Sequence, residues 1–309
     1  MRNTKIKFSV IIPTFNREHL LTDALKSAYD ALPIDGEIIV VNDGLKFSDE
    51  IISIIVECGA SFTTTSGSAG AGAARNLGAE MARGSWLLFL DDDDLISKDY
   101  WRAVKAYVDL NLKVEDDAYG FCASVSYSNR TAMRTAAHVD LKFTFNLNDG
   151  TNLKPKLAGF GLGFWVSKSL FERIGGINPE LQTNEDLDFC LKLLNAGAQC
   201  YQTKDIGAFI FTGNHGNTLA RSTTKRHSPK QRAAYFKHII DYNSHIIKSD
   251  PKTNRWLWKR FLKMEARCRG LRGLQLLWAT QSLTTPNKGA LSIYWGSEFL
   301  ISLFRNYKY

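Results

Sequence analysis

Three short, predominantly apolar runs separated by helix-length segments constrain the fold of this 309-residue chain most strongly. The runs span residues 8–12, 37–41 and 86–90, and apolar residues at helical spacing follow the first run over 18–31. Strands that are apolar throughout are typical of a parallel sheet covered on both faces. The sequence therefore predicts an α/β fold with a mostly parallel sheet flanked by helices.

The remaining expected elements are shorter or less regular. Helices are expected over residues 51–58, 71–82 and 186–196, and strands over 61–65, 118–127, 163–167 and 209–211. After residue 215 the chain reads as largely helical, with Pro229, Pro251 and Pro286 at helix starts or breaks. We therefore expect two parts, an α/β domain over residues 1–219 and a helical extension over 220–309.

Charge is distributed unevenly between these two parts. The formal net charge is +8, yet residues 221–309 carry 18 Lys and Arg against 4 Asp and Glu. They also hold four of the seven tryptophans. Basic residues interleaved with Trp and Leu indicate an anionic membrane surface, a nucleic acid or an acidic partner. The alternative is a solvated helical face with the tryptophans in a local core.

The cysteines and the N-terminal residues bear on the compartment. The five cysteines are odd in number and show no C-x-x-C spacing, which favours reduced, mostly buried thiols. The apolar run over 8–12 is too short for a signal-peptide core, and no stretch approaches the ~20 apolar residues of a membrane-spanning helix. These features predict a cytoplasmic protein.

An unusual run of four aspartates, Asp91 to Asp94, directly follows the third apolar run. In open α/β sheets, ligands bind at the carboxyl ends of the strands, and like charges this close need compensating cations. Carboxylate oxygens suit Mg²⁺ or Mn²⁺; the alternative is a solvated loop that caps the next helix. In an extended segment, Asp91 and Asp93 would point to one side, and Asp92 and Asp94 to the other.

A glycine-rich segment over residues 67–78 precedes a predicted helix and contains Arg75. Glycines before a helix let backbone N–H groups approach a phosphate, although the lone Gly70-x-Gly72 is a weak signal. Arg75 either pairs with a surface acid, pairs with the aspartate run or binds a diphosphate.

Two further motifs have both structural and functional interpretations. Glu185 and Asp186 begin a predicted helix, where acidic residues stabilise the helix dipole or supply a carboxylate base. His215 lies in a Gly/Asn-rich loop, either as a metal or phosphate ligand or as a plain surface residue.

Taken together, five short segments resemble the pattern of glycosyltransferase family 2, which has a GT-A fold. They are residues 9–17, 41–44, 72–78, 89–94 and 184–188, and the resemblance runs from about Phe8 to Arg221. It implies inverting transfer of a sugar from a nucleotide sugar, commonly a UDP-sugar, in polysaccharide or glycoconjugate biosynthesis. One departure is Asn42, which stands where an aspartate is frequent before Asp43.

The resemblance also implies roles for individual residues. On the donor side, Asp43 would bind the nucleotide base, in a pocket lined by Pro13, Thr14 and Glu18. Arg75 would order the nucleotide site. Asp91 and Asp92 would contact the nucleotide sugar. Asp93 would ligate Mn²⁺ or Mg²⁺, and His215, from its own loop context, is the second candidate metal ligand. Asp186 would be the catalytic base, with Glu185 and Trp165 in the acceptor site; the alternative for Trp165 is core packing.

Two alternative functions make different demands on the sequence. A dehydrogenase or sugar nucleotidyltransferase should carry a glycine-rich loop after its first strand, where this chain reads Pro13-Thr-Phe-Asn16. A non-enzymatic nucleic-acid binder using the basic extension would leave the aspartate run unexplained. The expected partners are therefore a nucleotide-sugar donor and a glycan or lipid-linked acceptor, with the extension against an anionic membrane at its cytoplasmic face and no nucleic acid.

Overall fold

The computed structural model describes residues 6–111, 117–127, 153–157, 159–212, 227–269 and 271–304. The chain divides into two compact units. Unit 1 comprises residues 1–147 and 158–220, and unit 2 comprises residues 148–157 and 221–309. The boundary predicted at residues 219/220 falls outside the described residues.

Unit 1 is built on an eight-stranded sheet in the order β3-β2-β1-β4-β7-β6-β8-β5. The first four strands are parallel: β3 (Ser61–Thr64), β2 (Gly36–Asn42), β1 (Phe8–Thr14) and β4 (Trp86–Phe89). The three predicted apolar runs supply β1, β2 and β4, and all their central residues are buried. The carboxyl ends of these strands meet at one edge of the sheet.

The other half of the sheet is mixed rather than parallel. It contains β7 (Phe164–Ser167), β6 (Ala118–Tyr127), β8 (Gln199–Phe211) and the short β5 (Leu95–Ile96). Strand β7 runs antiparallel to both β4 and β6, β8 runs parallel to β6, and β5 runs antiparallel to β8. Because β7 runs antiparallel to β4, it begins at the sheet edge where β4 ends.

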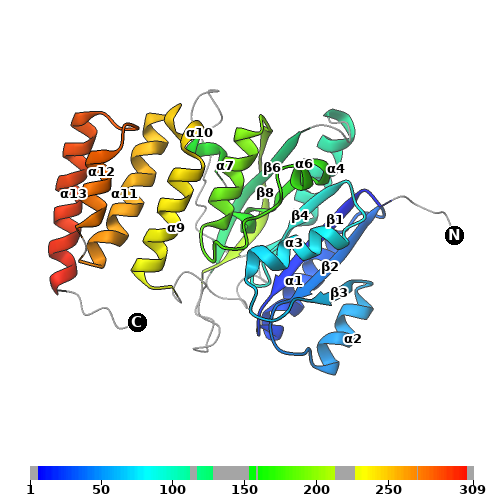
Figure 1. Ribbon diagram of the computed structural model, residues 1–309. Helices are drawn as coiled ribbons and strands as arrows, with labels where there is room; N and C mark the ends of the chain where they lie inside the picture. Colours follow the sequence, from blue (N-terminus) through cyan, green and yellow to red (C-terminus); the bar gives the residue numbers. More distant parts are fainter. Residues whose placement is uncertain are drawn as a thin grey trace. The chain divides into compact units, whose positions relative to one another are not determined.

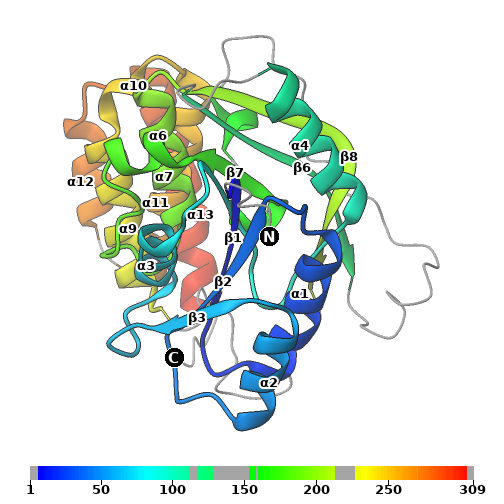
Figure 2. The same ribbon diagram turned by 90° about the vertical axis from the view of Figure 1, so that its right-hand side faces the viewer.

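Helices cover both faces of this sheet, as the sequence predicts (Figure 2). One face carries α1 (Glu18–Ala31) and α4 (Lys98–Asn111), with α2 (Asp49–Glu57) packed against α1. The other face carries α3 (Ala71–Met81), α6 (Lys168–Arg173), α7 (Glu185–Asn195) and the 3₁₀ turn η2 (Phe160–Leu162).

Successive side chains of β7 point to opposite faces of the sheet and so belong to two different cores. Phe164 packs against Phe160 and Phe189, on the α7 face. The next residue, Trp165, packs against Trp86 and Tyr201 and belongs to the core beneath α1 and α4. Adjacent residues of a strand point to opposite faces, so Trp165 faces away from α7.

Unit 2 is helical, as expected for the extension (Figure 1). It contains α9 (Pro229–Tyr242), α10 (Ser244–Lys248), α11 (Pro251–Arg267), α12 (Arg272–Ala279) and α13 (Thr285–Phe304), together with η1 (Lys154–Lys156). Helix α11 packs against α9, α12 and α13. The three prolines expected at helix starts or breaks, Pro229, Pro251 and Pro286, each occupy the first or second position of a helix. A backbone N–H at these positions has no partner within the helix, so its absence in proline removes no helical hydrogen bond.

Short-range polar contacts hold η1 within unit 2. Asp250 is buried at the N-cap of α11, and its carboxylate accepts hydrogen bonds from the Leu153 N–H (2.8 Å) and the Thr253 hydroxyl (2.8 Å). Trp258 and Trp295 are buried in this unit, whereas Trp278 is half exposed. Two of the four tryptophans of this unit therefore serve as core residues.

Two further expectations can be compared with the structure. All five cysteines have free thiols, and three of them are buried. Among the described helices, none combines the length and apolar character needed to cross a bilayer.

Candidate active site

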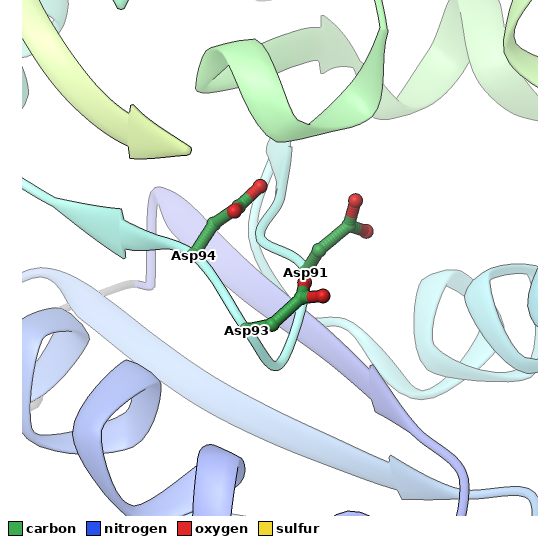
Figure 3. A group of neighbouring side chains, drawn as sticks. All are labelled: Asp91, Asp93 and Asp94. Atoms are coloured by element: carbon green, nitrogen blue, oxygen red, sulfur yellow. The ribbon is translucent and has the colours of Figure 1, made fainter. Parts of the chain in front are cut away.

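The four aspartates form a tight turn between β4 and β5. The Asp94 N–H donates to the Asp91 carbonyl oxygen at 3.1 Å, which closes the turn. Asp91, Asp93 and Asp94 each offer a carboxylate oxygen, and these atoms all lie within 4.8 Å of one another (Figure 3). The predicted two-sided alternation is therefore wrong, because the run is not extended and Asp94 joins Asp91 and Asp93.

Asp92 is fully buried, and Asp94 is nearly so. The Asp92 carboxylate accepts hydrogen bonds from the Thr14 hydroxyl (2.7 Å) and from Arg17 Nε (3.1 Å), and a second Arg17 nitrogen pairs with it. Burial raises the pKa of Asp92 to about 7, even though Arg17 favours the ionised form. Its contacts give Asp92 the role of an internal anchor of the turn.

Arg17 connects two members of the turn and was not predicted from the sequence. Besides Asp92, it donates from Nη1 to Asp93 Oδ2 at 3.1 Å. Its neighbouring carboxylates raise its own pKa against the effect of burial. The sequence signal that was available is the position of Arg17, three residues after the end of the buried strand β1 and at the same sheet edge as the aspartates.

Arg75 joins the acidic turn to the start of α7. It is only 4% exposed, and it donates from Nη2 to Asp91 Oδ1 (2.6 Å) and from Nη1 to Glu185 Oε1 (3.0 Å). Its guanidinium carbon lies 4.3 Å from the centroid of the Phe160 ring. The sequence left three partners open for Arg75. The structure shows one of them, the aspartate run, and adds Glu185.

Asp186 lies next to this bridge, in the first turn of α7. Its Oδ1 accepts a hydrogen bond from the Leu187 N–H at 2.7 Å. Burial, reinforced by the negative charge of Glu185, raises the pKa of Asp186 to about 7. A carboxylate with that pKa can accept a proton near neutral pH.

Two glycines let the backbone around η2 approach the carboxylates closely. A Cβ atom on Gly161 would collide with Asp94 Oδ2, and one on Gly159 would lie 3.3 Å from Asp186 Oδ2. Asp94 also accepts a hydrogen bond from the Phe211 N–H of β8 at 2.9 Å. Burial, with the charges of Asp91 and Asp93, raises the pKa of Asp94 well above its usual value. The turn thus concentrates carboxyl groups beneath a glycine backbone.

Asp43 uses its carboxylate to shape the glycine-rich loop. It accepts hydrogen bonds from the N–H groups of Ala69 and Gly70, each at 2.8 Å, and from the Thr65 hydroxyl. Its own N–H donates to the Thr14 carbonyl oxygen at 2.8 Å. Gly70 has φ +96°, a conformation that favours glycine. The implied base-binding residue therefore lies beside β1, already bonded to this loop.

The other predicted site residues lie in different surroundings. Pro13 is buried in β1. Glu18 binds the Ser48 N–H (3.0 Å) and hydroxyl (2.6 Å) and borders a cavity of about 560 Å³ between α1 and α2. Trp165 lies in the core on the opposite sheet face from α7, so the structure does not bring its indole to Glu185 and Asp186. His215 lies outside the described residues.

Comparison with known proteins identifies the family. Residues 9–175, more than half of the chain, match the sequence profile described as Glycosyl transferase family 2. The chain belongs to this family. The matched range includes the acidic turn and Arg75, whereas Asp186 lies beyond it.

Several relatives of this family-2 glycosyltransferase are themselves described as glycosyltransferases. One from Haemophilus influenzae is 28% identical over 78% of this chain and 77% of its own length. The poly(ribitol-phosphate) beta-N-acetylglucosaminyltransferase TarS of Staphylococcus aureus is 33% identical over 34% of this chain, but the match spans only 19% of that protein.

Solved structures show the same fold. The crystal structure of residues 1–349 of S. aureus TarS has a TM-score of 0.62 at 16% identity, covering 96% of this chain and 89% of that chain. Structures of the same TarS fragment with UDP and with UDP-GlcNAc have TM-scores of 0.60 and 0.63. The predicted GT-A type of α/β fold is confirmed.

The first prediction concerns the buried pair of Arg17 and Asp92. Replacing Arg17 with alanine should lower the free energy of unfolding by about 3 kcal/mol, because it leaves a buried carboxylate without its cation. Urea denaturation at pH 8 measures this loss.

Two variants make the result specific. Adding Asp92→Asn to Arg17→Ala should recover part of the loss, since the uncompensated charge is then gone. Arg83→Ala breaks an ion pair whose arginine side chain is 72% exposed, and it should cost less than about 1 kcal/mol. Equal losses for Arg17→Ala and Arg83→Ala would contradict the assignment.

Proposed function

We propose that this glycosyltransferase moves a sugar, with inversion, from a UDP-sugar to a hydroxyl group of a glycan or lipid-linked acceptor, using Mn²⁺ or Mg²⁺. The observation that carries this proposal is the Arg75 bridge, which connects Asp91 of the acidic turn to Glu185, the neighbour of Asp186. A donor-side acidic cluster and a carboxylate base thereby share one site. The UDP and UDP-GlcNAc complexes of TarS support the choice of donor class.

The acidic turn fits a divalent cation. Three carboxylates offer oxygen ligands within 4.8 Å of one another, and Mg²⁺ and Mn²⁺ prefer such ligands. Arg17 and Arg75 compensate Asp92, Asp91 and part of Asp93, but neither forms an ion pair with Asp94 among the described contacts. Asp91, Asp93 and Asp94 would hold the cation, which when bound stabilises negative charge on a diphosphate.

The residues around the turn position the donor. Thr14 and Arg17 fix Asp92, so the turn keeps one conformation while Asp91 and Asp93 face the donor. The loop after β3 is held by Asp43 and leads into α3, whose N-terminus favours the negative charge of a nucleotide. Preorganised charges of this kind need no rearrangement during the reaction.

Asp186 acts on the acceptor. A sugar or lipid hydroxyl is a weak nucleophile until its proton is removed, and a positioned carboxylate typically contributes about 10²–10⁴-fold. The hydroxyl oxygen attacks the anomeric carbon from the face opposite the diphosphate while Asp186 takes its proton. Direct displacement inverts the anomeric centre and requires no covalent enzyme intermediate.

The pKa of Asp186 predicts the pH dependence of transfer. Only the ionised carboxylate can take a proton, so kcat/KM should rise as the pH increases through about 7 and fall about tenfold per unit below it. Asp186→Asn should lower kcat by about 10²–10⁴-fold and leave UDP binding unchanged. Initial rates between pH 5.5 and 8.5, together with calorimetry, test both statements.

The control for Asp186→Asn is Asp241→Asn, which changes an exposed carboxylate of unit 2. That variant should keep the rate and pH profile of the unmodified enzyme. A rate retained by Asp186→Asn, or a profile flat through pH 7, would remove Asp186 from the role of base.

Metal dependence predicts a specific effect of Asp93→Ala. The unmodified chain should bind UDP more tightly with Mn²⁺ than without it. Asp93→Ala removes one metal ligand and should reduce this Mn²⁺-dependent gain in UDP affinity at least about tenfold. Asp99→Ala, at a side chain that is 77% exposed, serves as the control. Calorimetry of UDP with and without Mn²⁺ decides, and an Mn²⁺ gain that Asp93→Ala leaves intact would contradict the proposed ligand.

A further inference from the structure

Helix α13 has one buried face and one bare apolar face. Leu291, Trp295 and Ser302 are buried against the rest of unit 2. Ile293, Leu300 and Phe304 are 78%, 57% and 88% exposed. Their spacing of seven and four residues aligns them along one side of the helix, which we call the outer face of α13. Ile301 and Leu303, also exposed, extend this face.

The outer face of α13 carries no charge. The helix contains only two charged residues, Lys288 and Glu298. Lys288 donates to the Trp278 carbonyl oxygen at 3.0 Å, and Glu298 pairs with Lys263 of α11 at 3.2 Å. Both charges are thus turned toward neighbouring helices. Clustered exposed apolar side chains of this kind mark an interaction surface.

Different side chains border the two sides of this helix. On the side of α11, the Lys259 ammonium lies 4.4 Å from the centroid of the Tyr294 ring. Lys259 is exposed. On the side of α12, the half-exposed Trp278 donates from Nε1 to the Ser292 hydroxyl at 3.2 Å. Lysine and tryptophan beside an apolar helix face are typical of helices that lie in a membrane interface.

The charge of unit 2 favours an anionic partner. Residues 227–304 carry 13 Lys and Arg and 4 Asp and Glu. Asp241 and Glu298 are ion-paired within the unit, and Asp250 is buried at its N-cap. Glu265 lies beside Arg272. The unit therefore presents a surface with a large excess of exposed positive charge.

We propose that the outer face of α13 docks on an anionic bilayer, with the helix lying in the plane of the interface. The apolar side chains would enter the boundary between headgroups and acyl chains, while the exposed lysines and arginines of the unit contact anionic headgroups. A soluble polyanion accounts for the charge but leaves the apolar face uncovered. A second copy of this chain covers the apolar face but brings two positively charged surfaces together. The inference does not depend on the proposed reaction.

Vesicle flotation with the full chain tests this proposal. Vesicles of phosphatidylcholine with phosphatidylglycerol should carry the protein to the top of the gradient, and vesicles of phosphatidylcholine alone should carry far less. Leu300→Glu should weaken binding by at least about tenfold, because it places a charge in the apolar contact. Ile34→Glu is the matched control, since Ile34 is 91% exposed in unit 1.

The outcomes distinguish the three candidate partners: an anionic bilayer, a soluble polyanion and a second copy of this chain. Each variant is first checked for an unchanged melting temperature and unchanged helix content by circular dichroism. Absence of binding to the anionic vesicles would overturn the proposal. So would Leu300→Glu binding as tightly as the unmodified chain, which would assign the interaction to charge alone. A dimer that Leu300→Glu dissociates, without vesicle binding, would show that a second copy covers this face.

Discussion

The structure of this glycosyltransferase depends on compensating a dense group of carboxylates at the edge of its sheet. Six acidic side chains, Asp91 to Asp94 with Glu185 and Asp186, lie around one turn and one helix start. Two arginines enter this group: Arg17 pairs with Asp92 and Asp93, and Arg75 pairs with Asp91 and Glu185. Burying such charges is unfavourable unless each has a partner, so the arginines determine how the turn can fold.

The two arginines come from different elements, and this ties the site to the fold. Arg17 precedes α1 and Arg75 lies in α3, on opposite faces of the sheet, so the acidic turn is held from both sides. The mixed half of the sheet completes the enclosure, because β7 follows the η2 backbone that passes over Asp94. With two arginines among six carboxyl groups, acidic side chains outnumber basic ones in this site. That excess suits a divalent cation, and it also contributes to the raised pKa of Asp186.

Sequence reasoning predicted the elements whose apolar pattern is continuous. The strands β1, β2 and β4 and the helices α1 and α7 lie within a few residues of their predicted bounds. Strand β8 was expected only over 209–211, because the polar stretch at 201–205 hides a strand that the structure begins at Gln199. The antiparallel course of β7 was also unforeseen, since pairing direction depends on long-range contacts that no local pattern records.

The site was predictable in its residue types and less so in their contacts. The aspartates, Arg75 and Glu185 meet because the aspartate turn follows β4, and Arg75 of α3 reaches both Asp91 and Glu185 of α7. Arg17 was not assigned a role because a single arginine after a strand does not by itself show which side chains it pairs with. Trp165 was misplaced because its aromatic character suits both sugar stacking and core packing. Only the alternation along β7 decides between them.

The central claim is that the acidic turn holds a divalent cation against the diphosphate of the donor. Anomalous diffraction at the manganese edge, from crystals of the full chain grown with Mn²⁺ and UDP, tests it directly. The account predicts an anomalous peak in contact with Asp93 and at least one of Asp91 and Asp94, beside electron density for the diphosphate. Bound UDP with no manganese peak at this turn would contradict it.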